Sequence, residues 1–376
     1  MRAAMSERTA RMAWSWLAEC DAHETRAEVL RLGPQHALER ALAGDRVGPS
    51  ELRARVRGLD LEAMERVHRR CDIRTVIPGD PEWPERLDLI SDPPYCLYVR
   101  GGGDVGQLAS RSVALVGMRA ATEYGVRTAA DLAEGVSARG MVVVSGAAFG
   151  IDAASHRGAL ASDAPTVAVL ACGLDRAYPL AHAALLDQIA VDGAVVSEQP
   201  VGYAPFASRF LARNRLISGI SGGTVVVEAA LRSGAVNTAG HAQEQCRPLG
   251  AVPGPVGSRA SAGCHQLIRN GAVLVTDAAE VLDLCGDLGG DAVVPLRGLE
   301  LPLDHLPAQV RAVHDAVPPR AGVGVDHIVR VTGQPPLTVI RHLAVLVVDG
   351  HLRERGGTWV RVRRRGVANC ANAPAG

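Results

Sequence analysis

One short stretch of this 376-residue chain combines arginines with aromatic side chains. Residues 203–215 read YAPFASRFLARNR and contain no acidic residue, although the whole chain has only three phenylalanines. Guanidinium groups bind phosphates through paired hydrogen bonds, and an aromatic ring can stack on an unpaired base. We therefore expect a single-stranded nucleic acid to bind here; the alternative is a basic loop that seals a domain edge. The candidate contacts in this stretch are Arg209, Phe210, Arg213, Asn214 and Arg215.

Two loops upstream offer backbone amides and small residues. One apolar run ends at Gly117-Met118-Arg119, and the next ends at Ser145-Gly146, shortly before Phe149. Glycine lets the backbone approach a phosphate closely, and an arginine at a strand end can reach the same anion. Gly117, Arg119, Ser145, Gly146 and Phe149 are therefore further candidates. A strand-to-helix turn with a structural arginine is the alternative.

A third loop follows an apolar run that ends at Glu228. Ser233, Gly234 and Thr238 open a helix there and complete the set of candidate contacts. A carboxylate repels a phosphate at short range. We therefore expect Glu228 to accept from a sugar hydroxyl or a base, or to hold one of the arginines Arg213 and Arg215.

Asp152 and His156 lie four residues apart and could suggest a hydrolase triad with Ser145. The G-x-S-x-G elbow of such enzymes is missing, however. Asp152 is well placed to cap a helix, and we expect the Asp152–His156 pair to lock the loop. The chain is therefore not expected to be an enzyme.

The chain also lacks the dinucleotide-binding fingerprint. Gly117-Met118-Arg119 is not a G-x-G-x-x-G sequence, and Ser145-Gly146 stands where an acid would bind the ribose of the cofactor. These departures argue against NAD or FAD. We expect no cofactor.

Continuous apolar runs indicate the elements that carry these loops. A short run at 96–99 suggests a strand at the entry to the main domain, and longer runs follow from residue 113. Runs that do not alternate with polar residues are typical of parallel strands buried on both faces. Segments long enough for crossover helices separate most of them, which predicts a Rossmann-like, doubly wound α/β domain. The runs lie at 113–116, 141–144, 166–170, 194–196, 224–227, 249–252 and 272–275.

The pattern changes at both ends of this domain. Residues 1–80 show helical spacing broken by glycines, which predicts a small helical domain resembling a SAM or helix-hairpin-helix module, or else a simple bundle. Residues 81–286 form the Rossmann-like domain, and 287–304 read as a linker. Three helical segments and a hairpin predict a winged helix over 305–365. The tail at 366–376 is expected to be disordered.

Composition limits the classes of function. The formal net charge is zero, so any site for a polyanion must be local. All 40 basic residues are arginines, most simply through coding bias. The eight cysteines form no C-x-x-C pair, which argues against zinc, so no metal site is expected. No stretch approaches the roughly 20 apolar residues of a membrane span, so we expect a cytoplasmic protein without a membrane partner.

Taken in order, the motifs over residues 80–285 resemble those of the DNA-processing protein A family (DprA, also called Smf). Three departures from the family pattern occur: Met118 replaces a usual serine or threonine, Leu211 replaces a common proline, and Arg209 stands where members often have lysine. The motifs that carry the resemblance are Val-Gly-Met-Arg119, Ser145-Gly146 with Gly150-Ile-Asp152, Arg213-Asn214-Arg215, and Glu228 with Ser233-Gly234 and Thr238.

The resemblance implies a protein that binds single-stranded DNA, forms a homodimer and loads the RecA recombinase onto DNA taken up in natural transformation. It implies neither catalysis nor a cofactor. Arg119 and the backbone of Gly117 and Ser145-Gly146 would contact phosphates, and Phe210, Arg213 and Arg215 would complete the DNA pocket. The dimer surface would include His265, Leu267 and Ile268.

Two other functions remain open from the sequence. Gly222-Gly223-Thr224 with Glu228 resembles the signature of nucleoside-monophosphate phosphoribohydrolases, although the spacing does not match. The winged helix alone would suit a DNA-binding regulator. Its expected recognition helix offers only Arg341 and His342 for base edges, where such readers need several groups.

Overall fold

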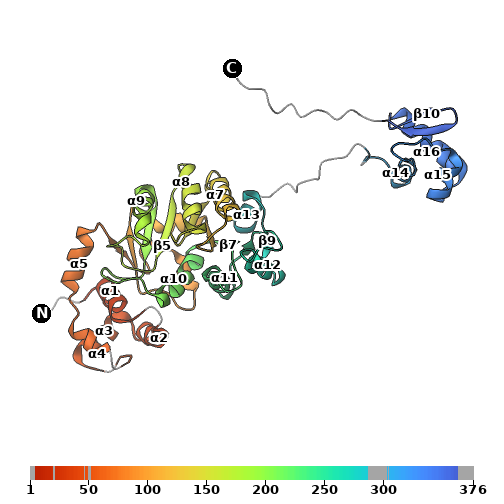
Figure 1. The fold of residues 1–376 in the computed structure, drawn as a ribbon. Helices are drawn as coiled ribbons and strands as arrows, with labels where there is room; N and C mark the ends of the chain where they lie inside the picture. Colours follow the sequence, from red (N-terminus) through yellow and green to blue (C-terminus); the bar gives the residue numbers. More distant parts are fainter. Residues whose placement is uncertain are drawn as a thin grey trace, which may run out of the picture. The chain divides into compact units, whose positions relative to one another are not determined.

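The computed structural model describes residues 5–19, 22–45, 47–49, 52–286, 303 and 305–362 (Figure 1). The chain divides into two compact units, Met1–Val293 and Val294–Gly376. The expected linker, apart from residue 303, and the expected disordered tail lie outside the described residues.

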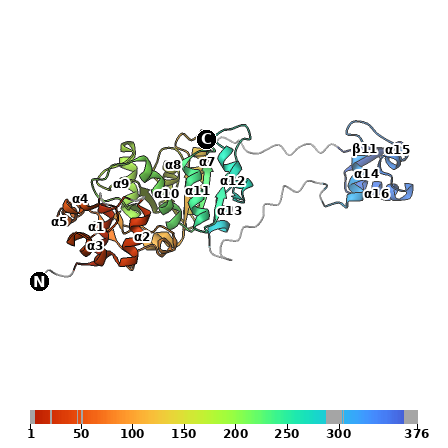
Figure 2. The same ribbon diagram turned by 90° about the horizontal axis from the view of Figure 1, so that it is seen from below.

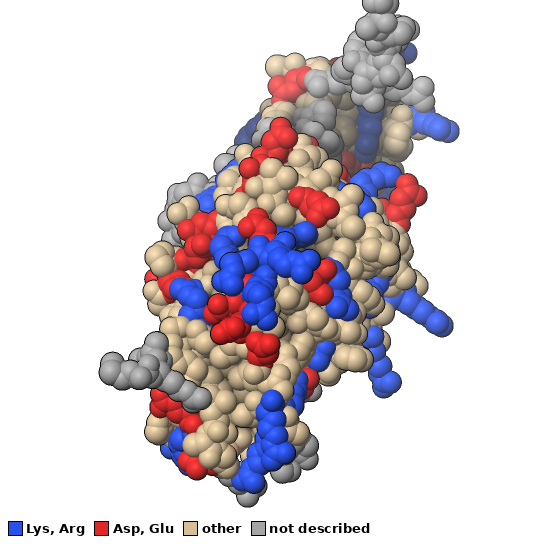
Figure 3. Space-filling view, turned by 90° about the vertical axis from the view of Figure 1, so that its left-hand side faces the viewer, with Lys and Arg blue, Asp and Glu red and all other residues tan. Residues whose placement is uncertain are grey.

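The first unit begins with five short helices, as the helical spacing predicts. Ser6 caps the first by accepting from the backbone N–H of Thr9, and Trp14 and Leu38 are fully buried between the helices. Arginines and acids are mixed over the side of the molecule at which α5 lies (Figure 3). The helices are α1 (Glu7–Leu17), α2 (His23–Leu32), α3 (Pro34–Ala43), α4 (Leu52–Arg57) and α5 (Leu61–Arg70).

A nine-stranded sheet follows, in the order β1-β2-β6-β5-β4-β3-β7-β8-β9. The strands from β3 onward pair in parallel, and β1 and β2 add an antiparallel edge. The Rossmann-like α/β fold is confirmed. The sheet begins at Arg74, ahead of the boundary predicted at residue 80. The strands are β1 (Arg74–Val76), β2 (Leu97–Arg100), β3 (Ser112–Gly117), β4 (Val142–Ser145), β5 (Thr166–Leu170), β6 (Ala194–Ser197), β7 (Gly223–Glu228), β8 (Leu249–Ala251) and β9 (Val273–Leu274).

Helices cover both faces of the sheet (Figures 1 and 2). In β3, Val113 and Leu115 pack against α7 and α8, while Ala114 and Val116 pack against α10 and α11. Both faces are apolar because both are buried, which explains the continuous apolar runs. The remaining elements are η1 (Glu85–Leu89), α6 (Val105–Ser110), α7 (Glu123–Ser137), α8 (Ile151–Ala161), η2 (Leu180–His182), α9 (Ala183–Asp192), α10 (Ala207–Ile220), α11 (Gly234–Glu244), α12 (Ala262–Arg269) and α13 (Ala278–Cys285).

The strand order reverses between β3 and β7. The chain adds β4, β5 and β6 on one side of β3 and then returns to place β7 on its other side. The loops after β3 and β7 therefore leave the sheet in opposite directions. Such a reversal opens a crevice at the carboxyl ends of the strands, which is where open α/β sheets bind ligands.

The second unit contains three helices and an antiparallel hairpin. Val313, Ile328 and Leu346 form its core. Gly356 and Gly357 both have positive φ and make the hairpin turn, which favours glycine. The elements follow the order expected of a winged helix, an assignment that stays a prediction. They are α14 (Ala308–Asp315), α15 (Val325–Thr332), α16 (Pro336–Val348), β10 (Leu352–Arg355) and β11 (Thr358–Arg361).

Within the described residues, no group of three or more potential metal ligands occurs, and six cysteines are free. No single helix there has the length and apolar character to cross a membrane. The pair α15 and α16 meets that test only when the two are joined, across a bend of 108°.

Candidate nucleic-acid interface

A cavity of about 210 Å³ lies at the strand-order reversal. The loop after β3, the first turns of α10 and the start of α11 enclose it. Neither helix has an acidic residue in its first turn, so the positive ends of both helix dipoles are left uncompensated there. The structure thus brings eight of the residues predicted from sequence to one site: Gly117, Arg119, Phe210, Arg213, Asn214, Ser233, Gly234 and Thr238.

Arg119 and the half-buried Phe210 form one part of this cavity wall. The Arg119 guanidinium carbon lies 4.7 Å from the centre of the Phe210 ring, a cation–π contact. Arg119 is exposed and makes no hydrogen bond or ion pair with any described residue. Tyr178 packs against the same ring, with the two ring centres 5.5 Å apart. A free guanidinium beside two aromatic rings, tilted by 49° to each other, suits a phosphate and a base.

Arg213 forms the floor of the cavity and is buried. Its guanidinium donates to the carbonyl oxygen of Gly146 at 2.8 Å and to that of Val169. A Cβ atom at position 146 would meet this guanidinium at 2.5 Å, so a side chain there would have to displace Arg213. Burial lowers the pKa of Arg213 to about 10, although the charge of Asp152 acts in the opposite direction. Arg213 therefore supports the site from beneath.

Ser145 and Gly146 lie below this arginine and do not line the cavity. The Ser145 hydroxyl donates to the carbonyl oxygen of Leu115 at 2.6 Å and so joins β4 to β3. Phe149 is 48% exposed and packs edge-on against His182, also away from the cavity lining.

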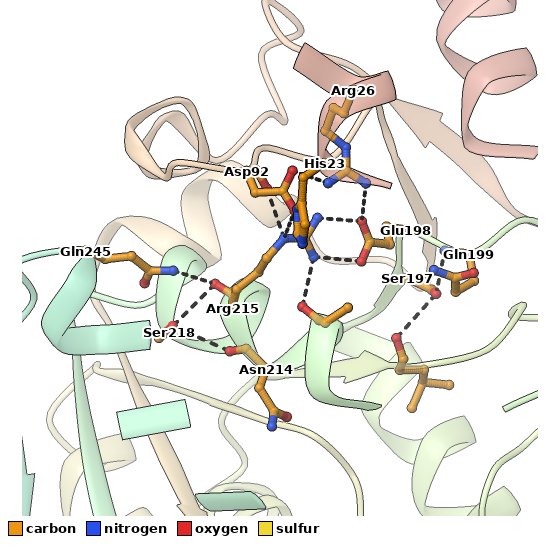
Figure 4. Close-up of polar contacts among 12 residues, drawn as sticks. His23, Arg26, Asp92, Ser197, Glu198, Gln199, Asn214, Arg215, Ser218 and Gln245 are labelled. Atoms are coloured by element: carbon orange, nitrogen blue, oxygen red, sulfur yellow. Dashed lines mark hydrogen bonds and ion pairs between the residues drawn. The ribbon is translucent and has the colours of Figure 1, made fainter. Parts of the chain in front are cut away.

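Arg215 lies on the opposite side of α10 from Arg213. Two residues along a helix correspond to roughly 200° of rotation, so both side chains cannot reach one cavity. Arg215 is buried and forms a bidentate ion pair with Glu198, with both N–O distances 2.7 Å (Figure 4). Its Nε atom also lies 3.3 Å from a carboxylate oxygen of Asp92. The structure therefore does not support the prediction that Arg215 lines the DNA pocket.

Arg26 of α2 completes this group of buried charges. It pairs with Asp92 and lies 3.9 Å from Glu198, so two acids face two arginines. Burial opposes ionisation of Asp92, but the two arginines outweigh it and hold the pKa of that carboxyl below its usual value. The cluster joins the helical segment to β6 and α10.

Arg209 also turns away from the cavity. Its guanidinium pairs with Glu19 at 3.0 Å and lies over the rings of Tyr203 and Phe206. The predicted arginine-rich contact surface is thus divided over three sides of α10. Sequence spacing did not reveal this division, because the side chains of residues close in sequence point to different sides of a helix.

Asn214 and the start of α11 are joined by hydrogen bonds at the cavity edge. Asn214 donates from its side chain to Asn237 Oδ1 at 3.0 Å. Ser233 caps α11 by accepting from the backbone N–H of Val236, and the Thr238 hydroxyl donates to the Gly234 carbonyl oxygen. The Asn214–Asn237 bond joins the start of α11 to α10, and the other two bonds fix the first turn of α11 itself.

Glu228 has a role that the sequence did not reveal. It accepts from the backbone N–H of Thr122 at 2.8 Å and from the Thr122 hydroxyl at 2.7 Å. Thr122 in turn caps α7 by accepting from the N–H of Gly125. The expected contact with Arg213 or Arg215 is wrong: buried Glu228 fixes the loop that carries Arg119.

The expected pairing of Asp152 with His156 is also wrong. Gly150, not Asp152, occupies the N-cap position of α8, and Asp152 accepts weakly from the N–H of Ala148 at 3.3 Å. His156 Nδ1 instead shares a 2.8 Å hydrogen bond with the hydroxyl of Thr166 on β5. His156 thus ties α8 to β5, whereas Asp152 bonds to the loop before α8 and lies at the cavity beside Arg213.

Replacing His156 by asparagine is expected to flatten the acid dependence of stability. Burial lowers the pKa of His156 to about 3, and its Nε2 atom is buried without a hydrogen-bond partner among the described residues. Between that value and the ordinary 6.5, only the unfolded chain takes up a proton. Stability should therefore fall by up to ~1.4 kcal/mol per pH unit on acidification below pH 6.5. Urea titrations at pH 7 and pH 5 measure this loss. An equal decrease in the free energy of unfolding for the unmodified protein and for His156→Asn would contradict the prediction.

The weak dimer candidates lie on α12. Leu267 packs into the core of its own chain, and Ile268 packs against that core. His265 Nε2 lies 3.0 Å from the carbonyl oxygen of Gly254. Little of Leu267 is therefore available to a second copy, and the dimer surface stays a prediction.

Comparisons with known proteins identify the family of this chain. A family model for DNA recombination-mediator protein A matches residues 74–286. A protein of Mycobacterium tuberculosis strain H37Rv, named for DNA processing as DprA, is 42% identical over 98% of both chains. Protein Smf of Escherichia coli K12 is 38% identical over 77% of this chain and 78% of its own.

Two solved structures are also similar. The X-ray structure of DNA processing protein A from Streptococcus pneumoniae has a TM-score of 0.66 and 31% identity, covering 76% of this chain and all of the other. That of the Helicobacter pylori protein, described for its binding mode with single-stranded DNA, has a TM-score of 0.51 and 29% identity, covering 56% and 94%. The chain belongs to the DNA recombination-mediator protein A family, which its DprA and Smf relatives represent.

Proposed function

We propose that this protein binds single-stranded DNA in the cavity between β3, α10 and α11. The observation that carries the proposal is the exposed Arg119 guanidinium over the Phe210 ring, 4.7 Å away. The guanidinium supplies a phosphate contact, and the rings of Phe210 and Tyr178 supply a stacking surface. The Helicobacter pylori relative, described for binding single-stranded DNA, supports the same ligand.

Single-stranded rather than duplex DNA suits this cavity for a physical reason. Bases in a duplex are already stacked on one another and offer no free face, whereas an unpaired base can stack on a protein ring. The start of α11 adds the positive end of a helix dipole beside the cavity. Together these features favour a strand whose phosphate and base bind side by side.

We infer that the protein acts without catalysis. The acids near the cavity are engaged in structural bonds: Glu228 holds Thr122, and Asp152 lies buried beside Arg213. The carboxylate that resembles the phosphoribohydrolase signature is this same Glu228, which is 2% exposed. Release of free adenine from AMP by the purified protein would favour the enzyme instead.

We further propose, on family grounds, that the bound strand is protected and passed to RecA, and that the protein acts as a homodimer. The DNA-processing names of its relatives support this role. Adding RecA to the protein–DNA complex should speed formation of RecA filaments on that strand. A rate equal to that with free DNA would count against the loading role.

Arg119→Ala is expected to weaken binding of an oligo-dT strand about tenfold or more, because an exposed charge-assisted phosphate contact is lost. The plot of log affinity against log salt should become less steep by ~0.7 for one lost phosphate contact. Fluorescence anisotropy at several salt concentrations measures both.

Arg69→Ala is the matched control, since Arg69 lies on α5 in an exposed pair with Glu65. It should bind like the unmodified protein. Unchanged affinity in Arg119→Ala, with an unaltered circular dichroism spectrum, would refute the cavity as the binding site. Tighter binding of duplex DNA than of single-stranded DNA would refute the proposal that single-stranded DNA is the ligand.

A further inference from the structure

A carboxylate occupies a site built from two arginines and two aromatic rings beside the DNA cavity. Glu19, which follows α1, accepts from Arg209 at 3.0–3.2 Å through both of its oxygens. The Arg209 guanidinium carbon lies 4.6 Å from the Tyr203 ring centre and 4.9 Å from that of Phe206. Arg209 thus contacts two rings while its guanidinium group faces a carboxylate.

Arg55 of α4 reaches the same carboxylate. Its Nη1 atom lies 3.4 Å from Glu19, and its Nη2 atom donates to the carbonyl oxygen of Trp16 and to the Tyr203 hydroxyl. Tyr203 also donates to Trp16. Arg55 therefore has partners that keep it in place even when Glu19 is absent.

The site that holds Glu19 is next to the cavity along α10. Arg209 and Phe210 are adjacent in the first turn of α10, and that turn has no acidic residue. Phe206, the N-cap of α10, is 59% exposed and contacts the Arg209 guanidinium. A strand that leaves the Phe210 side of this turn would meet the Phe206 ring and then the two guanidinium groups.

We propose that Arg209 and Arg55 form a second phosphate subsite, which Glu19 closes in the free protein and a longer DNA strand opens. The inference rests on the proposed binding of single-stranded DNA at the Arg119 cavity. A carboxylate bound by a guanidinium fork has the geometry that a phosphodiester would adopt there. The five amino-terminal helices thereby take part in strand binding through Arg55.

The exchange requires that Glu19 can be displaced. Its side chain is 38% exposed, whereas that of Arg209 is only 8% exposed, so solvent and salt reach the pair from the Glu19 side. A phosphate bound to a strand already anchored at Arg119 arrives at high effective concentration. Short strands that fill only the cavity would not reach Glu19, so the effect of Glu19 must depend on strand length.

The test measures affinity for an oligo-dT series of about 4 to about 16 nucleotides, a span typical of single-strand sites. Glu19→Gln keeps the shape but removes the competing charge. It should bind the longest strands about three- to tenfold more tightly, with a steeper salt dependence, and bind the shortest strands unchanged. Arg55→Gln should weaken binding of the long strands only.

Glu7→Gln is the control, because Glu7 pairs with Arg11 on α1 outside this site. A purely structural Glu19 would give a lower melting temperature in Glu19→Gln with equal affinity at every length, and this would overturn the subsite. Weaker binding by a folded Glu19→Gln would do the same. Arg119→Ala separates the two proposals: if it weakens binding while Glu19→Gln and Arg55→Gln change nothing, only the second subsite fails.

Discussion

Replacing Arg215 by alanine is expected to lower the free energy of unfolding by about 3–5 kcal/mol, because it breaks a buried ion-pair cluster and leaves an acid unpaired. Glu198 would lose both of its 2.7 Å bonds while staying 6% exposed. Arg26 would then face two carboxylates alone. Urea unfolding followed by circular dichroism measures the loss.

Two further variants show whether buried charge is the cause. Arg40→Ala removes an exposed ion pair with Asp45 and should cost under about 1 kcal/mol. The double variant Arg215→Met with Glu198→Met should recover part of the loss, since apolar side chains can replace a buried pair. A loss for Arg215→Ala no larger than for Arg40→Ala would contradict the cluster's role.

Arg213→Ala is expected to cost a similar ~3–5 kcal/mol, because the cavity floor collapses and Asp152 loses its counter-charge. The carbonyl oxygens of Gly146 and Val169 would also lose a donor. DNA binding should fall with the loss of fold. Arg119→Ala, in contrast, should weaken binding while the fold stays intact.

The pH dependence of Arg213→Ala provides an independent check. Burial raises the pKa of Asp152, and the Arg213 charge opposes that shift. Without Arg213 the pKa of the Asp152 carboxyl in the folded protein should rise further. The unfolded chain, in which this pKa is ~3.9, then loses its proton at lower pH than the folded protein, so the free energy of unfolding decreases as the pH rises above that value. The difference in free energy of unfolding between Arg213→Ala and the unmodified protein should therefore be smaller at pH 4 than at pH 7. An equal deficit at both values would exclude Asp152 as the cause.

Much of the fold could be predicted from the sequence, because strands buried on both faces leave continuous apolar runs. All seven runs from residue 113 onward correspond to strands β3 to β9. The boundary near residue 80 was less visible, because β1 is three residues long and pairs with a distant strand. Short edge strands depend on pairing partners that local composition does not encode.

The sequence predicted which loops form the site, but not which side chains face the ligand. Because the carboxyl ends of parallel strands share one edge, Gly117 to Arg119 and Ser233 to Thr238 had to meet there. Which arginine faces the ligand depends on the rotation of α10, and three arginines within seven residues looked equivalent in sequence. The structure separates them: Arg213 lies beneath the cavity, and Arg209 and Arg215 pair with acids elsewhere.

The four-charge cluster of Arg26, Asp92, Glu198 and Arg215 also bears on how this family can diverge. Loss of any one member leaves an uncompensated buried charge, so single exchanges at these positions should be strongly disfavoured. We therefore expect the four positions to covary among relatives. A relative without α2 would lack the counterpart of Arg26, and one of the two acids should then be replaced by a neutral residue. We therefore expect the residues at these four positions to change together, and to indicate whether a relative descends from a protein with the amino-terminal helices.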